Sequence, residues 1–237
     1  MNILLLNEDQ FLSPNRAIIK GRQLVHLHEV LKVSPGKRIN IGIKNSFISQ
    51  AIIESITKEY AELRLLDTRL EPPPALPCTL ILGLPRPRML QRSLQTIATM
   101  GVQQLILISS ERVEKSFWQT PLLKPDAINE QLELGLEQAK ATQIPLVKLC
   151  PNWREFSQTL LPALCNSHLN KVFAHPGCAL QAAPLTPGES LVAVGPEGGF
   201  VEDEVAAFLQ HGFTQVHLGA RILRVETAIP VLLAKLF

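Results

Sequence analysis

The feature that most constrains this chain is a run of prolines about one third of the way along it. The segment Glu71–Pro77 reads EPPPALP, with four prolines in six positions. Proline has a fixed φ and no backbone N–H, so such a run cannot form a helix or an inner strand. Proline-rich segments typically act as stiff linkers. We therefore predict two domains, residues 1–72 and 73–237.

Composition places the chain among ordinary globular proteins. Of its 237 residues, 46% are hydrophobic and 19% are charged, and the formal net charge is +2. This balance neither requires nor excludes RNA, so an RNA-binding face would have to come from local clusters of cations. We find neither a signal-peptide pattern nor an uncharged stretch of 18 apolar residues, and we expect a cytoplasmic protein without a membrane partner.

The four cysteines contain no C-x-x-C pair and are expected to be reduced, buried thiols. One pattern, Cys165-x-x-His168 followed by His175-x-x-Cys178, offers four possible zinc ligands. Its short spacer contains Lys171–Ala174, which has the pattern of a buried strand rather than of a zinc finger. We therefore predict no metal site.

The two domains differ in their predicted elements. In the first, a helix over Gly21–Leu31 precedes strands at Arg38–Ile43, Ser46–Ile56 and Ala61–Leu66, a pattern typical of a small β-barrel. In the second, strands and helices alternate, which predicts an α/β fold with a parallel sheet covered on both faces. Its predicted strands are Thr79–Leu84, Gln104–Ile108, Leu146–Leu149, Lys171–Ala174, Leu191–Val194 and Val216–Leu218. Its predicted helices are Met89–Met100, Pro125–Ala141, Phe156–Cys165, Glu202–His211 and Glu226–Phe237.

A glycine-rich loop follows the predicted strand Leu191–Val194. It reads G-P-E-G-G-F over Gly195–Phe200. A plain strand-to-helix turn needs one glycine, whereas three allow the backbone to approach a ligand closely. The chain has no G-x-G-x-x-G and no G-K-[ST], so neither a dinucleotide fingerprint nor a P-loop is present. Glu197 and the acidic start of the next helix would repel pyrophosphate, which favours a cationic or neutral ligand such as a sulfonium compound.

A second loop, L-G-A-R-I-L-R-V-E-T-A over Leu218–Ala228, places two arginines before the next helix. The helix dipole disfavours cations at that end, so a salt-bridged helix start would normally place the glutamate first. Unfavourable charge placement is tolerated more often at functional sites than elsewhere.

These two loops together resemble the RsmE family of the SPOUT superfamily, bacterial methyltransferases that modify N3 of one uridine in small-subunit (16S) ribosomal RNA. Three further segments resemble the same family: His175-Pro176 after a strand, S-E-R at Ser109–Arg112, and H-x-x-x-V-L-K-x-x-P-G-x-x-I from His26. The likeness covers nearly the whole chain, and the two C-terminal loops are its most specific part.

The resemblance implies a PUA-like β-barrel that helps to hold RNA and a C-terminal α/β domain with a trefoil knot. It also implies a homodimer and S-adenosylmethionine as the cofactor, with the backbone of Leu218, Gly219 and Leu223 around adenine. The residues expected to bind the cofactor are His175, Pro176, Gly195, Pro196, Glu197, Gly198, Gly199, Leu218, Gly219, Arg221, Ile222 and Leu223.

Methylation of N3 requires removal of its proton or stabilisation of the anion that develops on the ring. Arg224 is expected to stabilise that charge and Glu197 to orient the base or accept the proton. Arginines of both domains are expected to contact RNA phosphates, and Lys37-Arg38 forms a further basic group. The RNA-binding candidates are Arg16, Arg22, Arg86, Arg88, Arg92 and Arg221.

The chain departs from the family pattern at three positions, where Thr96, Thr99 and Ala141 replace a usual lysine, glutamate and arginine. The departures leave two alternatives open: a methyltransferase for another RNA or DNA target, and a homologue that binds RNA without turnover. An oxidoreductase is disfavoured because the dinucleotide fingerprint is missing.

Overall fold

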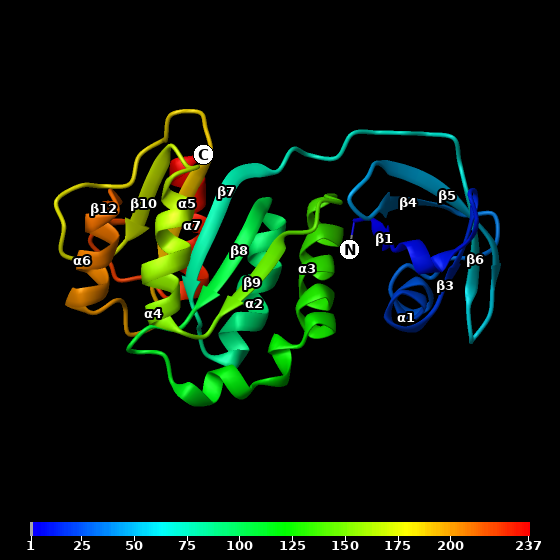
Figure 1. The fold of residues 1–237 in the computed structure, drawn as a ribbon. Coiled ribbons are helices and arrows are strands. Elements are labelled where there is room, and N and C mark those ends of the chain that lie inside the picture. Colours follow the sequence, from blue (N-terminus) through cyan, green and yellow to red (C-terminus); the bar gives the residue numbers. More distant parts are fainter. Residues whose placement is uncertain (1) are drawn as a thin grey trace. The chain divides into compact units, whose positions relative to one another are not determined.

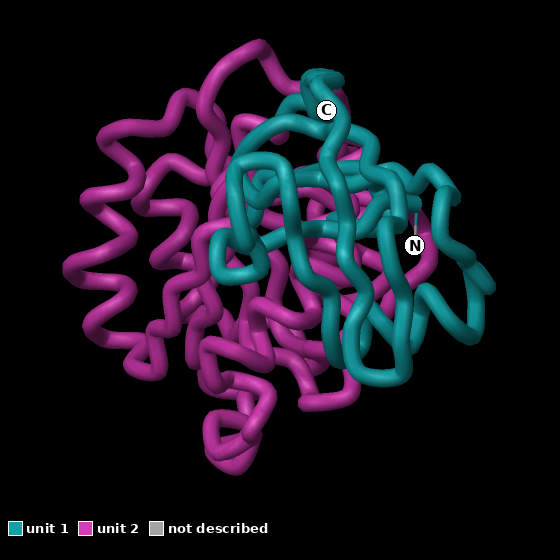
Figure 2. Tube along the Cα trace, turned by 90° about the vertical axis from the view of Figure 1, so that its right-hand side faces the viewer, with its two compact units in different colours: residues 1–74, 136–144 teal, residues 75–135, 145–237 magenta. Residues whose placement is uncertain are grey.

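The computed structural model describes residues 2–237 and divides into two compact units (Figure 2). The first comprises Met1–Pro74 with Leu136–Ile144, and the second comprises Ala75–Gly135 with Pro145–Phe237. The chain therefore passes from one unit to the other at Pro74, and twice more around the segment 136–144. Within residues 2–237, no helix is both long enough and apolar enough to cross a bilayer.

The first unit is built on a curled sheet that forms a half-barrel, and one helix lies against it (Figure 1). The strand order is β1-β4-β5-β6-β3-β2, and only β1 and β4 pair in parallel. Alternate residues point inward, as Ala51 and Ile53 of β5 do together with Leu24 and Leu27 of the helix. The elements are β1 (Leu4–Leu6), η1 (Glu8–Gln10), β2 (Phe11–Ser13), β3 (Arg16–Ile19), α1 (Gly21–Glu29), β4 (Arg38–Ile43), β5 (Ile48–Ile56) and β6 (Ala61–Leu65).

Helix α1 and strands β4 to β6 confirm the predicted elements, with ends that differ by up to two residues. The first three strands were not predicted. They have only three or four residues each, too few for an alternating pattern to stand out.

The second unit contains a six-stranded sheet in the order β12-β10-β11-β7-β8-β9, in which every pairing is parallel. All five residues of β11 are buried, as expected for an inner strand covered on both faces. The strands are β7 (Leu76–Gly83), β8 (Val102–Ile108), β9 (Leu146–Cys150), β10 (Asn170–Ala174), β11 (Ser190–Val194) and β12 (Thr214–Val216).

Helices cover both faces of this sheet: α2 and α7 pack against each other behind it in Figure 1, whereas α4 and α5 lie in front. The α-helices are α2 (Pro87–Thr99), α3 (Pro125–Ala139), α4 (Trp153–Glu155), α5 (Leu161–Cys165), α6 (Glu202–Gln210) and α7 (Val225–Leu236). Shorter turns are η2 (Lys115–Gln119), η3 (Pro121–Leu123) and the π-helical turn η4 (Phe156–Leu160). The predicted α/β alternation is confirmed.

Three sequence predictions need correction. Pro77 lies within β7, an inner strand, although the proline run was expected to exclude one. The strand tolerates it because its pairing with β8 is irregular between Leu76 and Thr79, and its pairing with β11 starts only at Cys78. Strand β12 ends at Val216, two residues earlier than predicted. The helix predicted over Phe156–Cys165 is interrupted by the π-helical turn.

An aromatic cluster fastens α6 to the sheet. The Phe208 side chain is fully buried, and its ring centroid lies 4.9 Å from that of Phe200, 5.0 Å from that of Phe213 and 5.5 Å from that of Phe173. Phe200 ends the glycine-rich loop, and Phe173 belongs to β10. Phe208 therefore holds the loop and a neighbouring strand through one ring.

Truncation of this ring should cost much of the stability of the second unit. We expect Phe208→Ala to lower the free energy of unfolding by about 3–5 kcal/mol, because the cavity left behind cannot close completely. Leu209→Ala is the matched control, since Leu209 is 49% exposed in the same helix. Urea denaturation followed by circular dichroism measures both. Equal effects of the two substitutions would contradict the role given to Phe208.

Candidate functional site

Three loops converge at one edge of the parallel sheet. They follow β10, β11 and β12, which are neighbours in the sheet, so their carboxyl ends meet at the same edge. The loops enclose a cavity of about 890 Å³. It is lined by all of the residues predicted to bind cofactor: His175, Pro176, Gly195, Pro196, Glu197, Gly198, Gly199, Leu218, Gly219, Arg221, Ile222 and Leu223.

The glycine-rich loop leaves the sheet in a tight turn beside β7. The amide of Gly199, at φ +72°, donates to the carbonyl of Pro196 over 2.8 Å. Gly83 ends β7 so close to this turn that a Cβ there would lie 2.6 Å from the backbone nitrogen of Pro196. The carboxylate of Glu197 accepts a hydrogen bond from the amide of Arg86 over 3.0 Å. The loop is thus anchored both to β7 and to the start of α2.

Arg112 is a cavity residue to which the sequence analysis assigned no role. Its guanidinium donates to the carbonyl of Gly198, and a Cβ on Gly198 would lie 3.0 Å from Cδ of Arg112. The only indication of this role in the sequence was the S-E-R element, which contains Arg112 and resembles the family. The arginine therefore supports the second half of the glycine-rich loop and brings a positive charge to the cavity wall.

A buried carboxylate joins the S-E-R element to the same loop. Glu204 is 2% exposed, and it accepts hydrogen bonds from the amides of Glu111, over 2.8 Å, and Val201, over 3.0 Å. Burial raises the pKa of this carboxyl, although the two amides act in the opposite direction. The acidic start of α6 therefore contains a structural link between two loops.

His175 forms the wall contributed by β10. Its backbone amide donates to Val216 over 3.0 Å, and the Gln215 side chain donates to the carbonyl of Pro176 over 3.2 Å. Burial and the nearby charge of Arg112 lower the pKa of the His175 imidazole below 6.5. The ring is therefore neutral at pH 7.

The third loop leaves β12 with little regular structure. Gly219 has φ +128°, and its amide donates to Nδ1 of His217 over 3.1 Å. Ile222 is 87% exposed, an unusual position for a large apolar side chain. Arg224 precedes the first residue of α7 and accepts hydrogen bonds from the amides of Thr227 and Ala228 through its carbonyl. Among the described residues, neither Arg221 nor Arg224 forms an ion pair.

The predicted RNA-binding arginines fall into two groups. Arg86, Arg88 and Arg92 are exposed at the start of α2, next to the anchor of the glycine-rich loop. In the first unit, Arg16 instead pairs with Glu54 and Glu62, and Arg22 pairs with Glu137.

The two histidines of the possible zinc pattern lie in different surroundings. The His168 ring lies 3.2 Å from Oγ1 of Thr79 and 2.8 Å from the carbonyl of Leu164, whereas His175 lines the cavity. Across residues 2–237, no group of three or more His, Cys, Asp or Glu side chains is placed to hold a metal ion.

The close approach at Gly83 predicts a sensitive position outside the cavity lining. Gly83→Ala should destabilise the second unit by about 1–3 kcal/mol, because backbone atoms of the loop must move to admit the methyl group. Urea denaturation measures the loss, and hydrogen exchange of residues 195–200 should report faster opening of the loop. Unchanged exchange in these residues would contradict the proposed crowding.

Comparison with known proteins connects this geometry to a family. Residues 72–236 match the model of the RNA methyltransferase domain. The chain is 29% identical to ribosomal RNA small subunit methyltransferase E of Treponema pallidum over 232 residues, which are 96% of this chain and 87% of the relative. This relative bears the name of the family that the motifs resemble.

Two solved structures share the fold. A ribosomal RNA small subunit methyltransferase E from Neisseria gonorrhoeae bound to S-adenosyl methionine has a TM-score of 0.73 and 23% identity, with 98% of this chain and 94% of that one covered. A Legionella pneumophila protein in complex with the same cofactor has a TM-score of 0.75 and 20% identity, with coverage of 99% and 96%. Because the family model covers most of its length, this chain belongs to the RNA methyltransferase domain family.

Proposed function

We propose that this chain transfers the methyl group of S-adenosylmethionine to N3 of a uridine in small-subunit ribosomal RNA. The observation that carries the proposal is the convergence of three loops, two of them with the family's specific motifs, on one cavity at the carboxyl edge of a parallel sheet. Methyltransferase relatives named for small-subunit ribosomal RNA support the target.

The cavity fits the proposed cofactor in shape and in charge. Its volume lies within the range of about 300–1,000 Å³ typical of small-molecule sites. The backbone of Leu218, Gly219 and Leu223 would hold the adenine, and glycines 198 and 199 leave room along the opposite wall. Arg112 is one cation of the lining that could pair with the carboxylate of the methionyl part, and neutral His175 adds no charge that would repel the sulfonium. When bound, the cofactor supplies an activated methyl group.

The residues of the chain would lower the barrier mainly by position and charge. Holding two reactants in line can contribute about 7–11 kcal/mol in ideal intramolecular cases. Arg224, exposed on the cavity wall and without an ion pair among the described residues, would stabilise the negative charge that develops on the uracil ring. Glu197 would mainly orient the loop through its bond to Arg86, and its role as proton acceptor stays a prediction.

The RNA would reach the cavity past the exposed arginines of α2. Arg86, Arg88 and Arg92, together with Arg221, would contact phosphates. Arg16 and Arg22 would contribute less than predicted, because their charges are already balanced by glutamates. The target uridine must be unpaired or flipped out, since N3 is hidden within a base pair.

The remaining proposals rest on the family likeness. They are a PUA-like RNA-binding domain over residues 1–72, a knotted domain over residues 73–237, a homodimer with sites near its interface, and action in the cytoplasm on the small ribosomal subunit. At one departure from the family, the Thr99 hydroxyl donates to the carbonyls of Gln95 and Gly135, which gives it a structural role in α2.

Methyl transfer provides the direct test. Incubation with radiolabelled S-adenosylmethionine and unmethylated 30S particles should yield labelled 3-methyluridine after digestion of the RNA. Label on another nucleoside would show that the target is not N3 of uridine, although the methyl-transfer reaction would stand. Cofactor binding without transfer to any RNA would favour a homologue that has lost turnover.

Arg224→Ala should lower kcat about 10²–10³-fold, the range measured when one donor to a developing oxyanion is removed. The Kd for S-adenosylmethionine should change little, because the interaction is with the base. Arg154→Ala is a matched control, since Arg154 is exposed in α4, away from the cavity lining. Equal activity of the Arg224→Ala and Arg154→Ala variants would refute this role.

Affinity for S-adenosylmethionine should fall in acid. The pKa of His175 lies below 6.5, so the ring is neutral at pH 7 and gains a proton only as the pH falls through that lowered pKa. The new positive charge would repel the sulfonium. Titration calorimetry at a series of pH values below 7 should show the affinity falling as the ring gains its proton, by about threefold or more once it is protonated, from the coulombic cost of one added like charge. In His175→Gln, which cannot gain this charge, the loss should disappear.

A further inference from the structure

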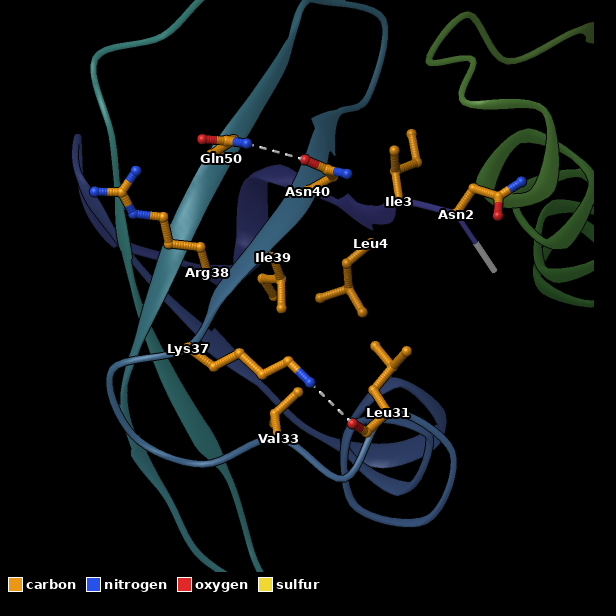
Figure 3. Close-up of a pocket in the computed structure, with 10 residues that line it drawn as sticks. All are labelled: Asn2, Ile3, Leu4, Leu31, Val33, Lys37, Arg38, Ile39, Asn40 and Gln50. Carbon is orange, nitrogen blue, oxygen red and sulfur yellow. Dashed lines mark hydrogen bonds between the residues drawn. The ribbon is translucent and has the colours of Figure 1, made fainter.

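The first unit contains a second pocket, of about 370 Å³ (Figure 3). Leu31 and Ile39 of the motif that starts at His26 line it, although the motif alone predicted no pocket. Its floor is apolar and comes from β1, β4 and the loop between α1 and β4. Its rim is polar and comes from Lys37 at the end of that loop and from β4 and β5, and Asn2 lines the pocket beside Ile3. The floor residues are Ile3, Leu4, Leu31, Val33 and Ile39, and the rim residues are Lys37, Arg38, Asn40 and Gln50.

The pocket exists because β4 is longer than its neighbour β1. Pairing between the two strands begins at Leu4 and Ile41. Residues Arg38–Asn40 therefore have no strand partner on the β1 side among the described residues. Helix α1 and the following loop close the space from below, where the amide of Val33 donates to Leu27 over 3.1 Å. The result is a recess with an open strand edge on one side and an apolar floor.

The charge around this recess is positive and unbalanced. Lys37 and Arg38 are exposed, no carboxylate lines the pocket, and neither cation forms an ion pair within residues 2–237. Elsewhere in this unit, by contrast, Arg16, Arg22 and Arg64 are all paired with glutamates. The Lys37 ammonium lies across the recess, 3.3 Å from the carbonyl of Leu31, whereas Arg38 points away from the floor (Figure 3). An anionic chain that crosses β4 would meet both cations.

The upper rim offers hydrogen-bonding groups that are only partly used. Asn40 and Gln50 face each other across β4 and β5, and Nε2 of Gln50 donates to Oδ1 of Asn40 over a long 3.3 Å. Nδ2 of Asn40 and Oε1 of Gln50 have no partner among the described residues. The two unused atoms lie at opposite ends of this pair (Figure 3), so each is available to a different polar group of an RNA strand.

We propose that this pocket binds one unpaired nucleotide of an RNA substrate. The base would lie on Leu31, Val33 and Ile39 with its edge toward Nδ2 of Asn40, and the flanking phosphates would lie against Lys37 and Arg38. The choice of RNA rests on the proposed function, while the pocket itself rests on the contacts above. Because its floor is aliphatic, stacking is weak, and the site positions the RNA with little base preference.

The test compares charge removal at the pocket with charge removal elsewhere in the same unit. The double variant Lys37→Gln, Arg38→Gln is compared with Lys58→Gln, which removes an exposed lysine outside the pocket lining. Fluorescence anisotropy with a labelled single-stranded RNA, over a series of salt concentrations, gives Kd for each full-length protein. The double variant should bind about tenfold more weakly, and its slope of log K against log salt should fall by about 1.4, at about 0.7 for each phosphate contact. An effect no larger than that of Lys58→Gln would overturn the proposal.

Cross-linking locates the base independently of these variants. An RNA that contains 4-thiouridine should cross-link within residues 31–40, and cross-links confined to other segments would also overturn the proposal.

Two further measurements separate this proposal from the proposed function. If the pocket acts as described, the double variant keeps the Kd for S-adenosylmethionine and the kcat at saturating RNA, and raises only the KM for RNA. If the wild-type protein transfers no methyl group, the proposed function fails, yet anisotropy and cross-linking still decide whether the pocket binds RNA.

Discussion

The site of this protein depends on one constraint, that neighbouring strands in a parallel sheet end at the same edge. Strands β12, β10 and β11 are adjacent, so the three loops that follow them must meet, however far apart they lie in the sequence. The loops still need support, because glycine-rich backbone has little rigidity of its own. Gly83 and Phe208 pack against the loop after β11 from the core. Arg112 of the S-E-R element bonds to the same loop, and Glu204 of α6 bonds to the amide of Glu111 in that element. The cavity is therefore shaped by residues that mostly lie outside the motifs.

The arginines of the two units differ in whether a carboxylate neutralises them. In the first unit, several arginines are neutralised by glutamates, and the buried carboxylate of Glu137 accepts hydrogen bonds from Arg22 and Gln23. Around the cavity of the second unit, Arg221 and Arg224 have no carboxylate partner among the described residues. Burial of an unpaired charge is costly, so these cations remain at the surface, where an anionic partner can reach them. Arg221 and Arg224 differ from other exposed cations, such as Arg154, because they also line the cavity.

The sequence predicted the elements of the second unit well because each has a strong and simple pattern. A buried strand such as β11 is apolar from Leu191 to Val194, and a covering helix such as α2 has one apolar face. The strands of the first unit that were missed are three or four residues long, and β1 and β3 owe their strand character to pairing with distant strands β4 and β6. The position of Pro77 within β7 was missed for a related reason, since an irregular pairing removes the need for its N–H. Local patterns cannot report such non-local compensation.

The same distinction explains which parts of the candidate site were predicted. The glycines of the Gly195–Phe200 loop and His175 could be predicted from the sequence, because a ligand-binding loop needs these residue types at fixed positions. Glu204 does not, since its pattern is also that of an ordinary acidic helix start, and only the structure shows both of its oxygens bound to amides of two separate loops. The pocket beside β4 could not be predicted from the motif that supplies Leu31 and Ile39, because aliphatic floors and amide rims are made of residues common on any sheet. A site that encloses a small molecule needs particular residue types at particular positions, and these can be recognised in a sequence. RNA bound mainly through its phosphates needs only unpaired positive charge at suitable places on the surface.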